Sequence, residues 1–181
     1  MTTSARGATI EDLYRIKEKA EIVRGEVVIM SPTGGIPGMG GGIIYASLLQ
    51  HQRAVGGGYA YPDGVGFVVN LPHRRSFSPD AAFHRGPKPT MKFVTGAPTF
   101  AVEVRSEDDY GPAAEDAMAA KRAHYFAAGT LVVWDVDLVG PDTFRSYRPG
   151  ATEPRIFRRG DLAEAEPAVP GWRFRVDELF E

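Results

Sequence analysis

The chain lacks several features that mark common classes of protein. Its 181 residues include no cysteine, which excludes a disulfide framework, a thiolate metal site and a cysteine nucleophile. Its four histidines, His51, His73, His84 and His124, do not follow the spacing of zinc ligands, so we expect no zinc site. No apolar run is long enough for a membrane span, and no signal-peptide core is found near the first residues. We therefore expect a cytoplasmic protein with no membrane partner.

A strong excess of basic charge is also missing. The net charge is −2 at pH 7, whereas nucleic-acid-binding proteins normally present a basic surface to phosphates. Arginines nevertheless crowd the stretch 145–175, and basic residues flank Asp80 on both sides. A solvated surface, offset by nearby acids, explains these residues equally well. Charge alone neither favours nor excludes DNA as a partner.

The rest of the composition is that of an ordinary globular domain. Hydrophobic residues make up 43% and charged residues 24% of the chain, which suits one domain spanning 1–181. No internal repeat and no linker divides it. The patterns along the chain predict helix, hairpin, helix, strands, helix and strands, in that order. This order predicts a mixed α/β or α+β domain built on one central sheet.

Local signals place the predicted elements. Thr9 and Asp12 form a capping box for a helix through about Ala20. A Pro/Gly-rich loop over 31–42 leads into a helix from residue 43 to about 54, and a further helix covers Pro112–Ala128. A short terminal helix is predicted over 176–180. Strands are predicted at 21–24, 26–30, 59–61, 66–70, 79–84, 99–105, 131–136, 143–147 and 155–158.

Two acidic residues stand inside apolar strand patterns. Alternation along Thr99–Arg105 places Glu103 and Arg105 on one face. Asp80 lies just inside the preceding predicted strand and reaches the same place if the two strands pair. Burying a charged group away from water costs roughly several kcal/mol of folding free energy, unless an oppositely charged partner compensates it. We therefore predict that Asp80 and Glu103 hold Mg²⁺ or Mn²⁺ together with the carbonyl of Val104.

A lysine on a predicted helix completes this group. Lys121 lies on one stripe with Met118 and Tyr125, at steps of three and four residues. A catalytic Lys121 would orient and help deprotonate the attacking water, or stabilise charge on the phosphorane-like transition state. The alternative is a lysine that buries its stem against the sheet and extends its ammonium to the rim.

The acids also have structural alternatives. Glu103 could form a buried ion pair with Arg105 or Arg122. Asp80 could be a strand-entry residue that hydrogen-bonds neighbouring backbone. Glu21 could act as a further catalytic acid near the metal, entering from the first hairpin, or could be a solvent-facing glutamate at a strand end.

The glycine-rich stretch Gly34–Gly42 invites a phosphate-binding interpretation but matches neither common fingerprint. No Gly-Lys-Ser/Thr ends it, and the dinucleotide-binding spacing would require glycine at Ile43. We therefore expect a flexible loop or a substrate lid. A small-molecule phosphate enzyme that uses this loop is a further hypothesis, and it predicts nucleotide binding independent of Asp80.

An ordered set of short motifs resembles a known family. The motifs are Glu21 with Arg24-Gly25-Glu26, the run Met30 to Gly35, Pro79-Asp80, Glu103-Val104-Arg105-Ser106, Lys121 with Tyr125, and Val133 to Asp137. Together they resemble the small bacterial endonucleases of restriction-endonuclease-like fold, long catalogued as a domain of unknown function within the PD-(D/E)XK superfamily. The resemblance covers about residues 11–180.

The resemblance implies a central mixed sheet flanked by helices, a divalent metal site, DNA cleavage and a homodimer. It also implies that the lysine expected two residues after Glu103 has moved to the helix as Lys121, with Arg105 in the vacated position and able to assist. Two departures bear on substrate engagement: the histidine usual after the Gly-Gly of the loop is absent, and Glu107 replaces the usual proline. We expect a Mg²⁺- or Mn²⁺-dependent DNA endonuclease. The alternative is a weakly active or inactive nuclease-fold protein that serves as a dimeric binding module.

Overall fold

The computed structural model describes residues 7–141 and 143–181, so residues 1–6 and 142 of the predicted domain lie outside the described part. Its helices are α1 (Ile10–Leu13), α2 (Gly35–Val55), α3 (Pro112–Ala127) and the 3-10 helix η1 (Val176–Leu179). Its strands are β1 (Ala20–Val23), β2 (Glu26–Ile29), β3 (Tyr59–Pro62), β4 (Phe67–Leu71), β5 (Arg74–Phe77), β6 (Ala81–His84), β7 (Val94–Thr95), β8 (Phe100–Val104), β9 (Val132–Val136), β10 (Phe144–Tyr147), β11 (Arg155–Phe157), β12 (Leu162–Glu164) and β13 (Arg173–Arg175).

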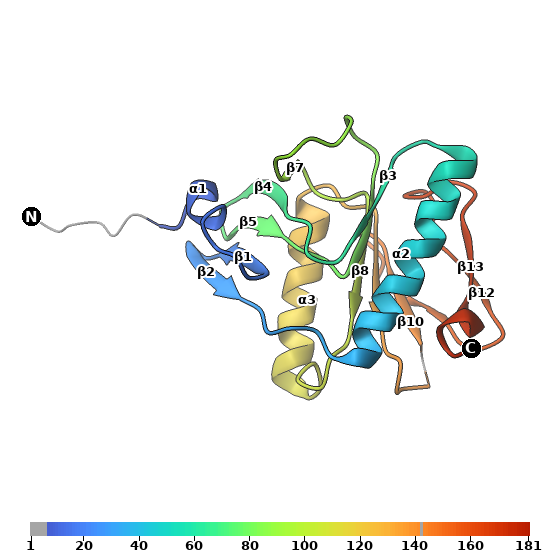
Figure 1. Ribbon diagram of the computed structural model, residues 1–181. Coiled ribbons are helices and arrows are strands. Elements are labelled where there is room, and N and C mark those ends of the chain that lie inside the picture. Colours follow the sequence, from blue (N-terminus) through green and yellow to red (C-terminus); the bar gives the residue numbers. More distant parts are fainter. Residues whose placement is uncertain (1–6, 142) are drawn as a thin grey trace, which may run out of the picture.

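A six-stranded mixed sheet forms the centre of the protein. Its strand order is β11-β10-β9-β8-β6-β3, in which β8 and β9 are parallel and the other neighbours are antiparallel. Helices α2 and α3 lie on opposite sides of β8, as Figure 1 shows. The expected central mixed sheet flanked by helices is therefore confirmed. No helix in the described part of the chain is both long and apolar enough to cross a membrane.

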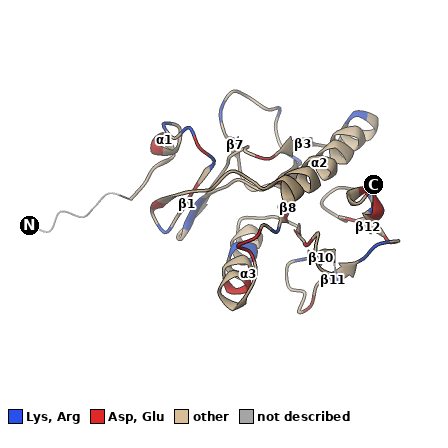
Figure 2. Cartoon of the chain, turned by 60° about the horizontal axis from the view of Figure 1, so that its bottom comes forward, with Lys and Arg blue, Asp and Glu red and all other residues tan. Residues whose placement is uncertain are grey.

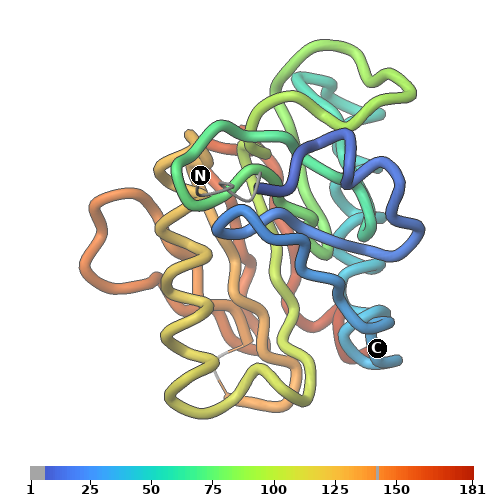
Figure 3. The backbone as a smooth tube through the Cα atoms, turned by 90° about the vertical axis from the view of Figure 1, so that its left-hand side faces the viewer, coloured from blue at the N-terminus to red at the C-terminus, as the bar shows by residue number. Residues whose placement is uncertain are grey.

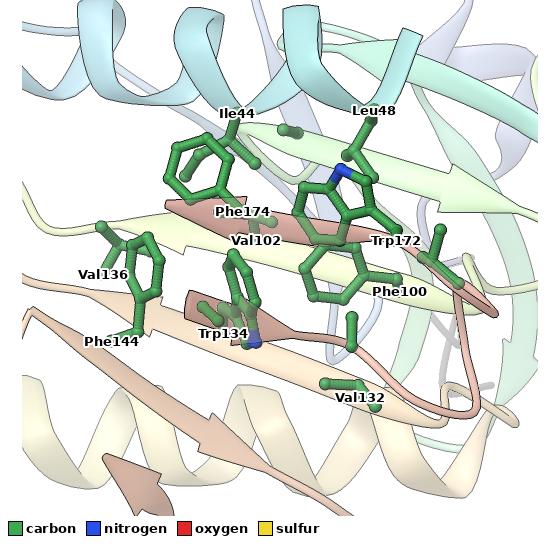
Figure 4. Close-up of a cluster of buried hydrophobic side chains, with 14 of the residues drawn as sticks. Ile44, Leu48, Phe100, Val102, Val132, Trp134, Val136, Phe144, Trp172 and Phe174 are labelled. Carbon is green, nitrogen blue, oxygen red and sulfur yellow. The ribbon is translucent and has the colours of Figure 1, made fainter. Parts of the chain in front are cut away.

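Alternation along β8 divides the core between the two helices. Phe100 and Val102 pack into a cluster with Ile44 and Leu48 of α2, whereas Ala101 joins a cluster with Tyr125 of α3. Figure 4 shows the α2-side cluster, where side chains of α2 reach toward the aromatic rings. Because successive residues of a strand point to opposite faces, Glu103 falls on the α3 side, as the sequence pattern predicts.

A second sheet, which the sequence patterns did not predict, extends from the central one. Its strand order is β2-β1-β5-β4-β7, and β1 joins β5 through the pair Val23 and Arg74. Figure 3 shows the N-terminal segment lying beside the segment that contains β4 and β5. The N–H of Ile22 also donates a 2.9 Å hydrogen bond to Oγ of Ser76. This sheet brings Glu21 of the N-terminal hairpin within 3.3 Å of the ammonium of Lys121 on α3.

The first predicted helix is much shorter than expected. The capping box of Thr9 and Asp12 forms, but α1 ends at Leu13. The following residues have good helix propensity, yet β1 already begins at Ala20 and pairs with both β2 and β5. Strand pairing thus outweighs the helix propensity of these residues, since propensity alone determines local structure only weakly. The strands β5, β7, β12 and β13, none longer than four residues, were not predicted.

The predicted loop over Gly34–Gly42 is wrong, because α2 begins at Gly35. A β-carbon on Gly41 would lie 3.2 Å from the backbone oxygen of Asp80, and one on Gly40 would lie 2.7 Å from Cδ1 of Leu138. Glycines here let the helix approach the strand ends closely. The nucleotide-binding hypothesis loses its basis, since the stretch is helical rather than a phosphate loop.

Candidate active site

A cleft of about 1160 Å³ opens between the start of α2, the end of β8 and α3. Lys19, Asp80, Glu103 and Lys121 all line it. These residues come from four separate segments of the chain. Figure 2 shows that α2 is almost free of charge until its C-terminal turn, whereas α3 carries both basic and acidic residues. Helix α3 therefore supplies charge to the cleft, and α2 supplies a close-fitting apolar wall.

Asp80 lies immediately before β6 and is fixed by its neighbours. Its backbone N–H donates to the carbonyl of Val102 at 3.0 Å. Its Oδ2 atom accepts a 2.8 Å hydrogen bond from the N–H of Val104, and Oδ1 accepts a 3.0 Å bond from Nζ of Lys19. The predicted backbone contact is thus present, and the side chain still borders the cleft.

Glu103 faces α3 from the end of β8. Its Oε2 atom accepts a 2.8 Å bond from Nζ of Lys121, and Oε1 accepts a 2.6 Å bond from the hydroxyl of Tyr125. Burial raises the pKa of Glu103, and the charges of Asp80 and Glu21 raise it further against the opposing effect of Lys121. Nearby negative charge thus disfavours the ionised form of Glu103, and a neighbouring cation favours it.

Lys121 is the ion-pair partner of two carboxylates. Besides Glu103, its ammonium lies 3.3 Å from Oε1 of Glu21. Burial opposes the charge of Lys121, but the carboxylates of Glu103 and Glu21 outweigh burial and raise the pKa of the lysine. An ammonium donates protons and cannot accept one. In this arrangement Lys121 is suited to stabilise negative charge rather than to deprotonate water.

Glu21 is buried, with 4% of its surface exposed, so the alternative of a solvent-facing glutamate is wrong, whereas its role as a further catalytic acid stays a prediction. It forms an ion pair with Arg74 and accepts a 2.8 Å bond from the N–H of Ser78. Burial alone would raise its pKa, but Lys121 and Arg74 outweigh burial and lower the pKa of Glu21. With its oxygens held in this way, Glu21 positions Lys121.

Arg105 does not pair with Glu103. Its guanidinium binds Asp135 through two 2.7 Å bonds and Glu115 through bonds of 2.5 and 3.1 Å. A further 3.3 Å bond reaches the carbonyl of Asp109. Since arginine has five N–H donors, these bonds engage all of them. The predicted alternative, an ion pair of Glu103 with an arginine, is therefore not the one that forms.

Three residues of the site had little or no signal in the sequence. Lys19 lies between α1 and β1, and its Nζ is 2.5 Å from Oδ1 of Asp63. Arg74 belongs to the missed strand β5. Only Tyr125 had a local signal, because it lies four residues after Lys121 on the helix stripe. Contacts of Lys19 and Arg74 depend on the second sheet and could not be read from spacing.

The residues fit a small divalent ion. Mg²⁺ is commonly held by one or two carboxylates and keeps several waters, and Asp80 and Glu103 with the carbonyl of Val104 are hard oxygen donors of this kind. Asp80, Glu103 and Val104 border the same cleft, so one ion could reach all three. Across residues 7–141 and 143–181, no group of three or more histidine, aspartate or glutamate side chains is arranged for a metal ion. The donor set is thus limited to this pair and the backbone.

Comparison with known proteins agrees with the motif resemblance. The Uma2 family, described as "Putative restriction endonuclease", matches residues 9–177. A crystal structure of "a putative nuclease belonging to DUF820" from Anabaena variabilis has a TM-score of 0.75 and 16% identity, covering 96% of this chain and 97% of that one. At this identity the likeness shows the fold. A search of curated proteins found no match. The chain, with its restriction-endonuclease-like fold, belongs to the Uma2 family.

Proposed function

We propose that the protein is a Mg²⁺- or Mn²⁺-dependent endonuclease that hydrolyses phosphodiester bonds of DNA, acting as a single domain. The observation that carries the proposal is the meeting of Asp80, Glu103 and Lys121 in one cleft. Membership of a family described as restriction endonucleases supports nuclease chemistry. DNA is the proposed substrate because it is the substrate of restriction endonucleases.

In the proposed mechanism, Asp80 and Glu103 would hold the ion together with the carbonyl of Val104. A divalent ion bound there would supply an activated water and polarise the phosphate. The ammonium of Lys121, held by Glu103 and Glu21, stabilises the negative charge that develops on the phosphate oxygens. The hydroxyl of Tyr125 fixes the orientation of Glu103.

The net charge of the site should attract an anionic substrate only after the site has bound a divalent cation. Four carboxylates (Glu21, Asp63, Asp80 and Glu103) face three cations (Lys19, Arg74 and Lys121) across the connected ion pairs. With every group ionised, this cluster has a net charge of about −1, which repels phosphate. A bound divalent ion would change the net charge of the cluster to about +1, and the negative charge of a single phosphodiester would then neutralise it. Metal and DNA should therefore bind cooperatively.

Plasmid cleavage tests the proposal. We expect supercoiled DNA to be cut with Mg²⁺ or Mn²⁺, to remain intact with EDTA, and to remain intact with either metal when Asp80 is replaced by Asn. Asp116 is an exposed aspartate of α3, and Asp116→Asn is the matched control that should cut normally. Cleavage by Asp80→Asn at the rate of the control would overturn the metal site.

One observation favours the second hypothesis, a dimeric binding module without useful catalysis. Each proposed metal-binding carboxylate is already paired with a lysine, Asp80 with Lys19 and Glu103 with Lys121. A module of this kind would bind DNA without cutting it in any metal. For both hypotheses we propose a cytoplasmic homodimer, which light scattering and cell fractionation test.

A further inference from the structure

We propose that Lys19 is the cation that competes with the metal for Asp80: its ammonium bridges Asp80 and Asp63 in the metal-free protein and is left with Asp63 alone when a divalent ion takes Asp80. This inference rests on the metal site of the proposed function. It adds a residue from outside the sequence motifs and gives that residue the role of a positioning group that competes with the metal.

The position of Lys19 carries the inference. Its Nζ lies 3.0 Å from Oδ1 of Asp80 and 2.5 Å from Oδ1 of Asp63, so one ammonium bridges two carboxylates. The other oxygen of Asp80 is held by the N–H of Val104. Oδ1, which pairs with Lys19, is the oxygen that we assign to the incoming ion, because Oδ2 already accepts the bond from Val104.

Simultaneous binding of the Lys19 ammonium and a divalent ion to Oδ1 of Asp80 would be electrostatically unfavourable. A Mg²⁺ ion binds oxygen at about 2.0–2.1 Å, which would place it within a few Å of the ammonium. Like charges at such a separation repel strongly in a partly buried site. The side chains of Lys19 and Asp80 are only 17% and 14% exposed, so water screens this repulsion weakly. Binding of the ion should thus displace the ammonium from Asp80.

Asp63 is placed to receive the displaced ammonium. It lies in the turn after β3 and its side chain is 42% exposed. Lys19 already contacts it, so the transfer requires only a rotation of the lysine side chain. The backbone of Lys19 stays fixed, because its carbonyl accepts a 2.9 Å bond from the N–H of Met30. Lys121 pairs with Glu21 and Glu103, whose side chains are less exposed than that of Asp63, so we expect it to stay.

Calorimetric titration with MnCl₂, in the absence of DNA, tests the competition. Lys19→Met removes the charge and keeps the stem, and we expect it to bind Mn²⁺ about tenfold more tightly than the unchanged protein. Lys19→Arg keeps the charge and should not tighten binding. Lys88→Met removes an exposed lysine from a distant loop and serves as the matched control. In EDTA, Lys19→Met should melt at a lower temperature than the control, because Asp80 loses its counter-ion.

Asp63→Asn gives a second, opposite test. It removes the alternative partner of Lys19, so Mn²⁺ should bind several-fold more weakly. Combined with Lys19→Met, the same substitution should change Mn²⁺ affinity much less, because Asp63 acts through the lysine.

The outcomes separate the two proposals. Equal or weaker Mn²⁺ binding by Lys19→Met, beside normal binding by the unchanged protein, overturns the role of Lys19 alone. An unchanged melting temperature of Lys19→Met in EDTA does the same. Absence of Mn²⁺ binding in the unchanged protein and in Lys19→Met overturns the metal site, and the role of Lys19 with it. Binding by Lys19→Met alone supports the competition.

Discussion

The N–H of Val104 donates a 2.8 Å hydrogen bond to Oδ2 of Asp80, a residue 24 positions earlier in the chain. Because Val104 follows Glu103 directly, this bond couples the position of one proposed metal-binding acid to the backbone of the other. The N–H of Asp80 returns a bond to the carbonyl of Val102. The end of β8 and the start of β6 thus hold both carboxylates in a fixed relation before any ligand arrives.

Replacing Asp80 by Asn should separate charge from hydrogen bonding. The amide oxygen can still accept from the N–H of Val104, so we expect the melting temperature to change by only a few degrees. Loss of the anionic ligand should weaken Mn²⁺ binding by about a hundredfold or more and abolish cleavage. Calorimetry and plasmid cleavage measure both effects. Retention of Mn²⁺ binding would contradict the assignment of Asp80 as a ligand.

Replacing Lys121 by Met should change the pH dependence of metal binding. The ammonium of Lys121 opposes the burial that raises the pKa of Glu103, so its removal should raise this pKa further. Glu103 then loses its proton only at higher pH, and Mn²⁺ binding should shift to higher pH. Cleavage at saturating Mn²⁺ should fall by about 10²- to 10³-fold. Titrations between about pH 5 and 8 test the shift, with Lys121→Arg as the variant that keeps the charge.

Glu21→Gln should destabilise the protein in a pH-dependent way. It leaves the buried cations of Arg74 and Lys121 without their common carboxylate, which costs about 3 kcal/mol. The pKa of Glu21 lies below its ordinary value of 4.5, so its contribution is complete above that pH and is lost as the pH falls through the lowered pKa. Urea unfolding at several pH values should show the difference from the unchanged protein shrinking in acid. Glu26→Gln, on the exposed face of β2, should show no such effect.

Arg105→Lys should lower the stability of the protein but leave its proposed catalytic activity nearly unchanged. A lysine cannot replace the fork of bonds to Asp135 and Glu115, so we expect a loss of about 3 kcal/mol in the free energy of unfolding. Cleavage per folded molecule should remain close to normal at low temperature. A large fall in kcat with unchanged stability would instead assign Arg105 to the chemistry.

Two neighbouring glycines of α2 should respond differently to replacement by alanine. A β-carbon on Gly42 meets nothing within 4 Å, so Gly42→Ala should raise stability by about 0.5–1 kcal/mol through helix propensity. Gly41→Ala gains the same propensity but presses on Asp80, 3.2 Å from its backbone oxygen and 3.4 Å from its β-carbon. It should therefore stabilise less or destabilise, and should weaken Mn²⁺ binding. Equal behaviour of the two variants would show that α2 does not position Asp80.

The sequence predicted the parts of the site that depend on local periodicity. Strand alternation placed Glu103 on one face of β8, and helical spacing placed Lys121 beside Tyr125; both arrangements are present. Pairing of the segment after Asp80 with β8 was also anticipated. Their catalytic and metal-binding roles stay predictions.

The remainder depended on contacts between distant segments. Lys19 and Arg74 reach the site only because the second sheet forms, and nothing in their own neighbourhoods indicates a partner. The burial of Glu21 depends on the same sheet, so spacing alone left open whether it faces solvent. The glycines of 35–42 predict a loop because propensity disfavours glycine in helices. Close packing against Asp80 and Leu138 is the tertiary reason for them, and one sequence cannot show it.

The α2-side core is completed by the last strand and turn of the fold. Trp172, Phe174 and Val176 pack there against Phe100 and Trp134, and the indole of Trp172 donates a 3.1 Å bond to Oγ of Ser47 in α2. Before these residues have left the ribosome, the hydrophobic core between α2 and β8 is incomplete. A nascent chain that has not yet reached Trp172 should therefore be unable to support α2 and β8, so the proposed activity should appear only after this segment has been synthesised.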